Sequence, residues 1–425
     1  MAYHVLDEAK RCLNCKKPMC KNGCPISTPI PDMIHTLLEG DIDKAGRMLF
    51  ENNPLSMICS QVCNHENQCE GHCILSRKGV PVHASVIEHY ISTYYFDRLR
   101  FDKIEKNGKK VAIIGSGPAG IAIALILGQR GYDITIFEGK EQIGGVLRYG
   151  IPEFRLPKSD LDRYKDKLIA LGVKIRPNTM VGGSITIEDL FRDGYLAVFI
   201  GIGVWRPNTL RIKGESLGNV HYAINYLTNP DVYNLGEKVN IIGAGNSAMD
   251  VARTALRHGA REVTVYSRHD YFAASEHEIN YAKLEGVTFK VHVEPVELVD
   301  EGCIFADLEC DGHGTLTRIP GTERLEPADS TIIAISQGAD NALVARTGGL
   351  NVTDRGLLVT NSFGGTTRDG IFASGDVVSG AKTVVEAVRY SKLVADAIDE
   401  YIQNLDENGK PKRLTEEDLL EETTN

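Results

Sequence analysis

The stretch "VAIIGSGPAG", residues 111–120, decides the expected fold class of this 425-residue chain. Four apolar residues run into Gly115, Gly117 and Gly120, and the apolar segment "IAIALILGQRG" follows. Such glycines permit a tight turn, close approach of the backbone to a pyrophosphate, and close packing of a helix on a strand. The next apolar stretch, "DITIFE", ends in Glu138, whose carboxylate can accept hydrogen bonds from ribose hydroxyls. Together these features indicate a dinucleotide-binding βαβ unit.

A second unit of the same kind is "VNIIGAGNSAMDVARTALRHGAREVTVYSR", residues 239–268. Gly243 and Gly245 match the first two glycines, and Ala248 takes the third small-residue position. Two dinucleotide units in one chain suggest a flavin nucleotide in one and a nicotinamide nucleotide in the other.

The second unit differs from the first at the end of its second strand. The position that corresponds to Glu138 is occupied by Tyr266, and Arg268 follows two residues later. An arginine at this strand end suits a 2′-phosphate, so the sequence favours NADPH over NADH. A solvated surface arginine is the alternative.

A third nucleotide-type segment is "DGIFASGDVVSGAKTVVEAVRYSKLVADAIDEYI", near the C-terminus. It reads as a strand, then Gly375 and Asp376, then a helix that begins near Thr383. This order places Asp376 and a helix N-terminus where they can meet the polyol and phosphate of a flavin nucleotide. The alternative is an N-capping aspartate on a surface helix.

Eight of the ten cysteines lie in the first 73 residues, within "CLNCKKPMCKNGCP" and "CSQVCNHENQCEGHC". Thiolates are soft ligands that suit iron–sulfur clusters or zinc, and a run that closes in C-x3-C-P is typical of ferredoxins. A reducing cytosol disfavours disulfides. We favour iron–sulfur over zinc, because clusters give a flavin a one-electron partner and zinc does not.

Composition narrows the class of protein further. The net charge of −10 and the pI near 5.7 argue against a nucleic-acid partner. No apolar run approaches the ~20 residues that span a bilayer, and the N-terminus lacks the apolar core of a secretory signal. We therefore expect a cytoplasmic protein with no membrane partner.

These pieces together make the chain similar to the family of the glutamate synthase small (beta) subunit. That family includes the flavin module of dihydropyrimidine dehydrogenase and the large subunit of NADH-dependent ferredoxin:NADP oxidoreductase. The resemblance extends from Arg11 to about Ile402, and "GGVLRYGIPEFRLPK" and "GAGNSAMDVAR" are among its most specific marks.

The resemblance implies an α/β protein with two Rossmann-like, glutathione-reductase-like domains after an α-helical iron–sulfur domain. The implied parts are an iron–sulfur domain at 1–105, a split FAD domain at 108–229 and 340–405, an NAD(P)H domain at 230–339, and a polar tail at 406–425.

It also implies the residues that hold the nucleotides. For FAD these are Gly115, Ser116, Gly117, Pro118, Ala119, Gly120, Glu138, Gly144, Gly145, Leu147, Arg148, Gly375, Asp376 and Thr383. For NAD(P)H they are Gly243, Gly245, Asn246, Ser247, Ala248 and Arg268.

Two [4Fe–4S] clusters with interleaved ligands are implied by the same resemblance. The ligands of the first would be Cys12, Cys15, Cys20 and Cys73. The ligands of the second would be Cys24, Cys63, Cys69 and, as a non-cysteine fourth ligand, Glu88. His89 is the rival for that fourth position, and Cys59 is left over.

The expected function is that of an NAD(P)H-oxidising flavoprotein, which passes single electrons through the clusters to a partner protein. The first expected partner is a glutamate synthase large subunit, in a hetero-oligomer. The alternatives are a pyrimidine-reducing partner and a ferredoxin-linked oxidoreductase. Hydride transfer needs alignment rather than an acid–base pair, so no catalytic side chain is expected. A self-contained disulfide reductase would need a closely spaced cysteine pair beside the flavin. After residue 73 the sequence offers only Cys303 and Cys310, which are seven positions apart, so this class of enzyme is not expected.

Overall fold

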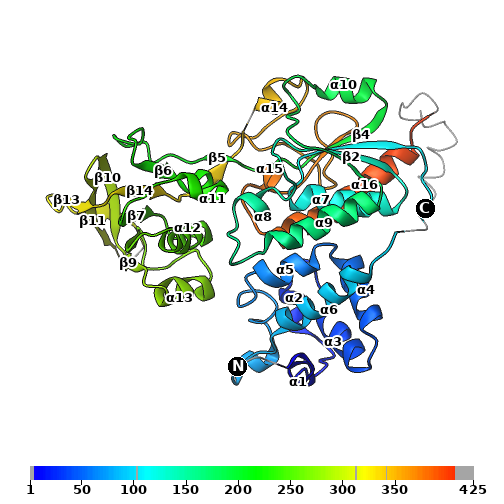
Figure 1. Ribbon diagram of the computed structural model, residues 1–425, viewed down its shortest axis with the longest axis horizontal. Helices are drawn as coiled ribbons and strands as arrows, with labels where there is room; N and C mark the ends of the chain where they lie inside the picture. The colour runs from blue at the N-terminus through cyan, green and yellow to red at the C-terminus, as the bar shows by residue number, and fades with distance from the viewer. Residues whose placement is uncertain (1–3, 102–103, 312–313, 341, 407–425) are drawn as a thin grey trace.

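The computed structural model describes residues 4–101, 104–311, 314–340 and 342–406. The expected polar tail therefore lies, from residue 407 onward, outside the described residues. Figure 1 shows a helical N-terminal part and two α/β parts, each built on its own sheet. Within the described ranges, no helix is both long and apolar enough to cross a membrane.

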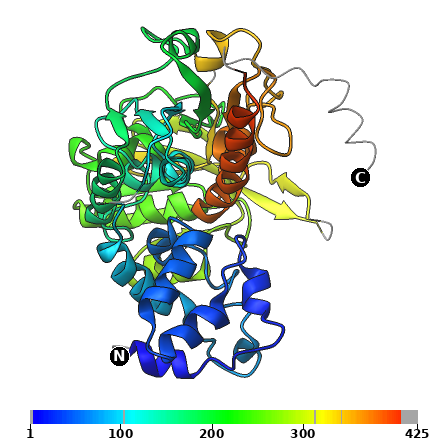
Figure 2. The ribbon, with the colours of Figure 1, turned by 90° about the vertical axis from the view of Figure 1, so that its right-hand side faces the viewer.

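The N-terminal part consists of short helices that pack around α6, and it is blue in Figures 1 and 2. Helix α6 buries Ile87, Ile91 and Phe96 against its neighbours. Asp41 caps α4 by accepting a hydrogen bond from the Lys44 amide at 2.9 Å. The helices are α1 (Val5–Lys10), α2 (Met19–Gly23), α3 (Ile30–Leu38), α4 (Ile42–Asn52), α5 (Ser56–Val62), the 3₁₀ turn η1 (Ile74–Arg77) and α6 (Ala84–Arg98).

The first sheet is parallel, with strand order β16-β4-β1-β2-β3. Residues 111–114 of β1 are all buried, as expected for a strand covered on both faces by helices. Thr383 and Glu386 form a capping box that starts the long helix α16. The strands are β1 (Lys110–Ile114), β2 (Asp133–Phe137), β3 (Lys174–Arg176), β4 (Tyr195–Ile200) and β16 (Ile371–Ala373). The helices are α7 (Pro118–Gln129), α8 (Val146–Tyr149), α9 (Lys158–Ala170), α10 (Ile187–Arg192), α14 (Ala342–Ala345), α15 (Asp376–Ser379) and α16 (Val384–Gln403).

The second sheet is also parallel, with order β6-β14-β7-β8-β9; its strands β14-β7-β8-β9 repeat the arrangement β4-β1-β2-β3, whereas its edge strand β6 comes first in the chain and β16 comes last. A small antiparallel sheet, in which β10 and β13 both pair with β11, is attached to it. The strands of the second sheet are β6 (Val220–Tyr222), β7 (Lys238–Ile242), β8 (Glu262–Tyr266), β9 (Thr288–Lys290) and β14 (Ser330–Ile333). The antiparallel strands are β10 (Val293–Val299), β11 (Gly302–Cys310), β12 (Leu316–Arg318) and β13 (Arg324–Pro327). The helices are α11 (Ala223–Thr228), α12 (Asn246–Arg257), α13 (Glu276–Leu284) and the 3₁₀ turn η2 (Pro230–Val232).

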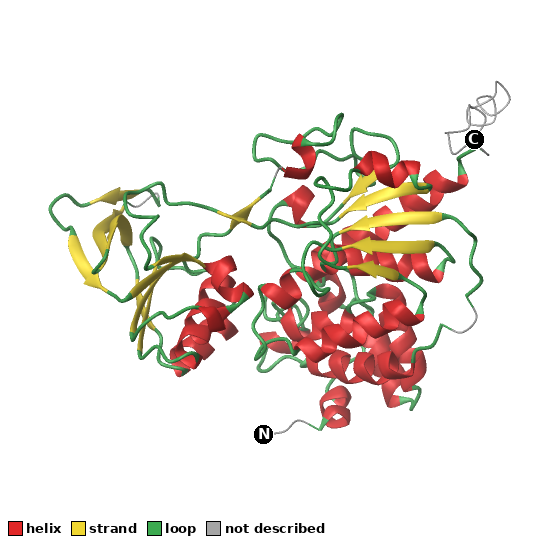
Figure 3. Ribbon diagram, turned by 45° about the horizontal axis from the view of Figure 1, so that its top comes forward, coloured by secondary structure: helices red, strands yellow, loops and turns green. Residues whose placement is uncertain are grey.

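A two-stranded ribbon links the two α/β parts, as Figure 3 shows. The chain leaves the first part through β5 (Arg206–Pro207) and returns through β15 (Gln337–Gly338), which pair antiparallel. The expected nicotinamide domain begins at residue 230, whereas β6 and α11 already pack with the second sheet from residue 220. The strand "VHY" is too short to mark this start locally, because only its pairing with β14 makes it an edge strand.

The helical part and the first sheet share one hydrophobic core. Leu55 and Phe96 pack in the same cluster as Leu161 and Tyr164 of α9. The Tyr164 hydroxyl donates to the Pro54 carbonyl at 2.9 Å. This shared core fixes the cysteine-rich part against the first α/β unit. The α/β fold class with two Rossmann-like units after a helical region is confirmed.

Candidate functional site

A cavity of about 560 Å³ opens at the carboxyl ends of β1 and β4, beside the N-terminus of α7. In open α/β sheets this edge is where ligands bind, and the volume suits a large cofactor. The expected flavin residues in its wall are Gly115, Ser116, Gly117, Pro118, Ala119, Glu138, Gly145, Gly375, Asp376 and Thr383.

The glycine turn leaves a bare backbone cradle under this cavity. Gly115 has a φ of +93°, and a Cβ placed there would lie 2.7 Å from the Gly201 carbonyl oxygen. A Cβ on Gly145 would lie 2.7 Å from the Gly117 Cα. Gly117 is the N-cap of the 12-residue helix α7, whose free amides and dipole favour a phosphate. These residues fit a pyrophosphate.

Glu138 is held at the end of β2 with its carboxylate facing this turn. It accepts hydrogen bonds from the Ser116 amide at 2.9 Å and the Lys140 amide at 2.8 Å, and another from the Ser116 hydroxyl. Glu138 is buried, so these donors compensate the loss of water. Its position in the cavity wall suits the ribose of a dinucleotide.

Asp376 lies on the other side of the same cavity, with the N-terminus of α16 beside it. Burial raises the pKa of Asp376 to about 6, although the Lys382 amide donates a hydrogen bond to the carboxylate at 3.2 Å. Ser374 and Ser391 are hydrogen-bonded at 2.9 Å beneath this turn. The pair of Asp376 and a helix N-terminus fits a polyol and a phosphate.

Four expected flavin residues lie outside the cavity wall, and each has a structural task. A Cβ on Gly120 would lie 2.1 Å from the Gly115 carbonyl oxygen, so Gly120 allows α7 to pack on the turn. Gly144 has a φ of +123° before α8. Leu147 is buried in the core, and Arg148 donates to the Ile143 carbonyl at 2.8 Å.

Part of the wall of the large cavity was not expected from the sequence. Residues 201–205 line the cavity after β4, and Lys140 and Trp205 face each other there, with the Lys140 Nζ 4.2 Å from the indole centroid. A signal for the missed segment was present, because glycines follow the buried strand in "FIGIGVW".

The second glycine turn repeats the geometry of the first. Gly243 has a φ of +124°, and a Cβ there would lie 2.3 Å from the Ala334 carbonyl oxygen. Gly245 caps α12 and faces open space, while Ala248 is buried beneath the helix start. The Asn246 side-chain oxygen accepts a hydrogen bond from the Ser275 amide at 3.0 Å, and Ser247 is half-buried next to it.

Arg268 lies just after β8, at the strand end where a 2′-phosphate would be recognised. Its side chain is 57% exposed, and its guanidinium is 3.6 Å from the Glu294 carboxylate. Glu294 also pairs with Arg318 at 2.8 Å. Arg268 is therefore weakly paired and accessible, which fits a phosphate ligand.

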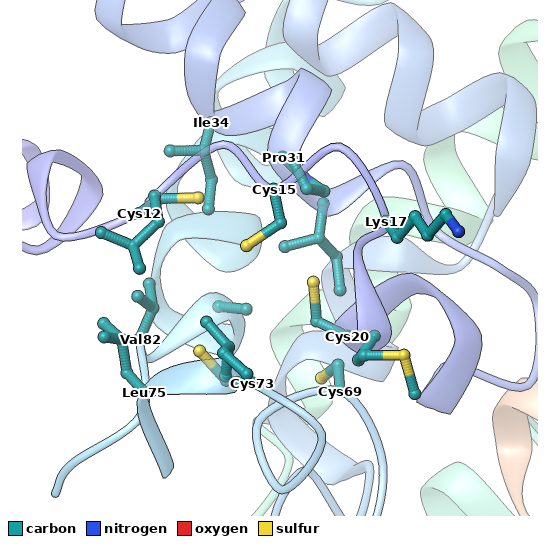
Figure 4. Close-up of a pocket in the computed structure, with 15 residues that line it drawn as sticks. Cys12, Cys15, Lys17, Cys20, Pro31, Ile34, Cys69, Cys73, Leu75 and Val82 are labelled. Atoms are coloured by element: carbon teal, nitrogen blue, oxygen red, sulfur yellow. The ribbon is translucent and has the colours of Figure 1, made fainter. Parts of the chain in front are cut away.

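Five cysteines surround a second cavity, of about 90 Å³, in the helical part (Figure 4). They are Cys12, Cys15, Cys20, Cys69 and Cys73. Burial, together with the nearby charges of Cys73, Cys12 and Cys15, raises the pKa of Cys20 to about 11. The remaining wall is largely apolar, with Ile34, Leu75 and Val82 in view.

Glu88 lies near two cysteines of the second expected set, Cys63 and Cys69, although Cys69 also lines the cavity of the first set. The Cys59 hydrogen bond, burial, and the charges of Cys59, Glu88 and Cys69 all raise the pKa of Cys63. Burial, then Glu88, Glu70 and Cys24, raise the pKa of Cys69.

Burial and the charge of Glu70 raise the pKa of Glu88 to about 8. His89, the rival for the fourth ligand position, lies elsewhere: its Nδ1 is 3.2 Å from the Ser60 hydroxyl on α5. The structure therefore brings Glu88, and not His89, next to Cys63 and Cys69. Within the described ranges, no group of three or more His, Cys, Asp or Glu is placed to hold a single metal ion. The thiol-rich donor set in apolar surroundings fits iron–sulfur clusters.

Two family models match the chain, one over its helical N-terminal part and one over its two α/β parts. A family model described as pyridine nucleotide-disulphide oxidoreductase matches residues 109–391, and one described as dihydropyrimidine dehydrogenase domain II, 4Fe–4S cluster, matches residues 2–99. The glutamate synthase [NADPH] small chain of Escherichia coli is 31% identical over 431 residues, which cover 93% of this chain and 91% of that one. The chain belongs to the glutamate synthase small-chain family.

The chain is also similar to a second relative and to a solved structure. The NAD-dependent dihydropyrimidine dehydrogenase subunit PreT of Escherichia coli is 32% identical over 411 residues, which cover 94% of each chain. The structure of Mycobacterium tuberculosis FprA in complex with NADPH has a TM-score of 0.59 at 17% identity, covering 75% of this chain and 89% of that one, and supports the fold.

The family assignment confirms three expectations. The chain is an NAD(P)H-dependent oxidoreductase, it carries a 4Fe–4S part, and it carries a flavin and pyridine-nucleotide part. The individual ligands of each cofactor remain predictions.

Proposed function

We propose that this chain is the electron-input subunit of a hetero-oligomeric enzyme, and that it serves a large subunit like that of glutamate synthase. When bound, a flavin would supply two-electron chemistry with NADPH and iron–sulfur clusters would supply one-electron chemistry, so together they would convert a two-electron donor into a one-electron supply. The observation that carries the proposal is the shared core, which holds the cysteine-rich part against the unit that contains the flavin cavity. The chain's own residues bind and position these groups.

The effects of the cysteines on one another's pKa support two ligand sets. The charges of Cys15 and Cys73 raise the pKa of Cys12, and those of Cys12, Cys15 and Cys73 raise the pKa of Cys20, which supports these four residues as the first set. The thiols of Cys24, Cys63 and Cys69, with Glu88, form the second neighbourhood.

The packing of the two sets supports an order of electron flow. Cys63 and Cys24 contact the core that the helical part shares with the flavin unit. Cys12, Cys20 and Cys73 contact the separate core of the helical part, which Cys24 and Cys69 of the second set contact as well. Since the second set reaches the shared core and the first set does not, we place the second set nearer the flavin and the first set nearer an acceptor.

The nicotinamide nucleotide is NADPH in this proposal, because Arg268 is the accessible cation at the strand end. The split flavin domain then closes at the β5–β15 ribbon, with the nicotinamide domain inserted between these strands. We place the protein in the cytoplasm, where a reducing environment keeps the thiols available for clusters.

A second candidate is the flavin subunit of a pyrimidine-reducing enzyme. The PreT relatives favour it, since they match this chain at a similar identity and over nearly their whole length.

Anaerobic stopped-flow mixing tests the proposed function. We expect NADPH to bleach the flavin absorbance faster than NADH does. Substituting Arg268→Ala should raise the apparent Kd for NADPH about tenfold and leave that for NADH unchanged, because a charge-assisted contact to phosphate is worth about 1.5–3 kcal/mol. A flavin that neither nucleotide bleaches would refute the proposal. Addition of a purified large subunit of either type then identifies the acceptor.

A further inference from the structure

Three exposed apolar side chains line the first cysteine cavity, and the two segments that carry them contain five cations. We define this docking patch by its apolar centre, Leu13, Met19 and Ile74, and by the cations of the same two segments, Lys16, Lys17, Lys21, Arg77 and Lys78, which are exposed except for the half-buried Lys21. Leu13 is 62% exposed although it is apolar, and all three central residues also line the cavity. The apolar centre of the patch therefore lies between solvent and the cavity that the thiols line.

The charge of the patch is opposite to that of the chain. Residues 12–31 and 71–87, the two segments that build it, contain all five cations and no aspartate or glutamate, although the net charge of the chain is −10. The carboxylates next in sequence are mostly engaged: Glu8 is buried and pairs with Arg11 at 2.5 Å, and Glu70 accepts from the Ser85 amide at 2.9 Å. Asp32, exposed on α3, borders the patch.

This arrangement matches the anatomy of a protein interface rather than that of a solvated face. A solvated face gains nothing from adjacent exposed Leu, Met and Ile side chains, whereas an interface places apolar groups at its centre and polar groups at its rim. A cationic rim attracts a partner with carboxylates and speeds its association. The place of the patch also suits electron exit, because it covers a cavity lined by Cys12, Cys15, Cys20 and Cys73, none of which packs in the core shared with the flavin unit.

We propose that the docking patch binds an electron-accepting protein through a face on which carboxylates surround a small apolar centre. This inference rests on the proposed function and extends it, since it states which surface and which charge the acceptor recognises. Lys16 and Lys78 come from the two different segments and lie outside the cavity wall, so they report on the rim and not on the thiols.

Isothermal titration calorimetry of the holoprotein tests the surface with an acidic plant-type [2Fe–2S] ferredoxin, used as a probe that presents carboxylates around its cluster. A wild type that does not bind this probe at low ionic strength would overturn the docking patch. The test variant is Lys16→Glu/Lys78→Glu. The matched control is Lys44→Glu/Lys174→Glu, which changes the net charge equally at exposed positions on α4 and β3. We expect the test variant to raise the Kd for ferredoxin about tenfold or more at low ionic strength, and the control to leave it within about twofold.

Two further measurements complete the test. The Kd of the wild type should rise with ionic strength, and that of the test variant should depend on it much less. Equal losses in both double variants, or no loss in the test variant, would overturn the docking patch. Flavin bleaching by NADPH is measured separately in all three proteins. Its absence from the wild type would count against the proposed function and leave the binding result to judge the patch.

Discussion

At the scale of the residue, the central question is which side chain takes the fourth position in the second expected set of cluster ligands. Glu88 and His89 are adjacent in sequence, and both are plausible ligands by residue type. On α6 they point about 100° apart, so only one of them can face the cysteines. The helix turns Glu88 inward to the thiols and His89 toward Ser60.

We therefore predict that Glu88→Ala lowers the iron content of anaerobically purified protein by about half, because one of two [4Fe–4S] clusters loses a ligand. His89→Ala is the matched control and should retain its iron. Cys59 lies beside Cys63 and could replace the lost ligand, so Cys59→Ser/Glu88→Ala is measured as well. Full iron content in that double variant would contradict the ligand set.

At the scale of the element, α12 and α13 are tied to the flavin unit by a buried ion-pair network. Arg155, just before α9, donates to Asp250 of α12 at 2.8 Å and to Glu278 of α13 at 3.0 Å. Arg253 also donates to Glu278, at 2.5 Å. These residues are nearly buried, so each depends on its partners for solvation.

Arg155→Leu should lower the free energy of unfolding by about 3–5 kcal/mol, because it leaves Asp250 buried beside Glu278 with one cation fewer. Denaturant unfolding of the holoprotein measures this loss. Arg192→Leu is the control: it removes an exposed i,i+3 pair with Asp189 and should cost less than about 1 kcal/mol. Similar losses in the two variants would show that the network does not stabilise the docked elements.

The pH dependence of the Arg155→Leu loss follows from Asp250. Burial raises the pKa of Asp250 from its ordinary value of 3.8 to about 6, and Arg155 opposes that rise. A carboxyl whose pKa is higher in the folded state contributes stability below its unfolded pKa and loses it as pH rises through about 6. Without Arg155 the folded pKa rises further, so the loss in the variant should be smaller at pH 4 than at pH 7. A loss that does not change with pH would contradict this account.

At the scale of the whole molecule, the loop between Cys63 and Cys69 contacts the nicotinamide part directly. Glu66 in this loop accepts hydrogen bonds from the first amides of α13, those of Glu276 and His277, the latter at 3.1 Å. The N-cap of α13 is Ser275, whose amide binds the Asn246 side chain in the second glycine turn. A continuous set of contacts therefore connects the nucleotide turn with the loop between Cys63 and Cys69, two of the expected cluster ligands.

Glu66→Ala should release this contact. We expect hydrogen exchange at the Glu276 and His277 amides to accelerate about tenfold or more, since a hydrogen bond to a charged group is worth about 1.5–3 kcal/mol. Glu237→Ala, which removes only an exposed pair with Arg261, is the control. Unchanged exchange in Glu66→Ala would show that the helical and nicotinamide parts do not meet through this residue.

The two nucleotide-binding turns and the thiol-rich region could be predicted from the order of the residues alone. Each turn is a local object: strand, glycines, helix and second strand follow one another within about 30 residues, so Gly115 and Gly243 could be placed without knowing what surrounds them. The chemistry of the cysteines was also local, because ligand softness belongs to the residue type.

The contacts between segments that are distant in sequence could be seen only in the folded chain. Residues 220–228 joined the second sheet because β6 pairs with β14, more than 100 residues later. The grouping of Cys73 with Cys12, the position of Glu88 beside Cys63, and the contact of Glu66 with α13 depend on how helices pack. Packing depends on the shapes of both partners at once, and a local pattern contains only one of them.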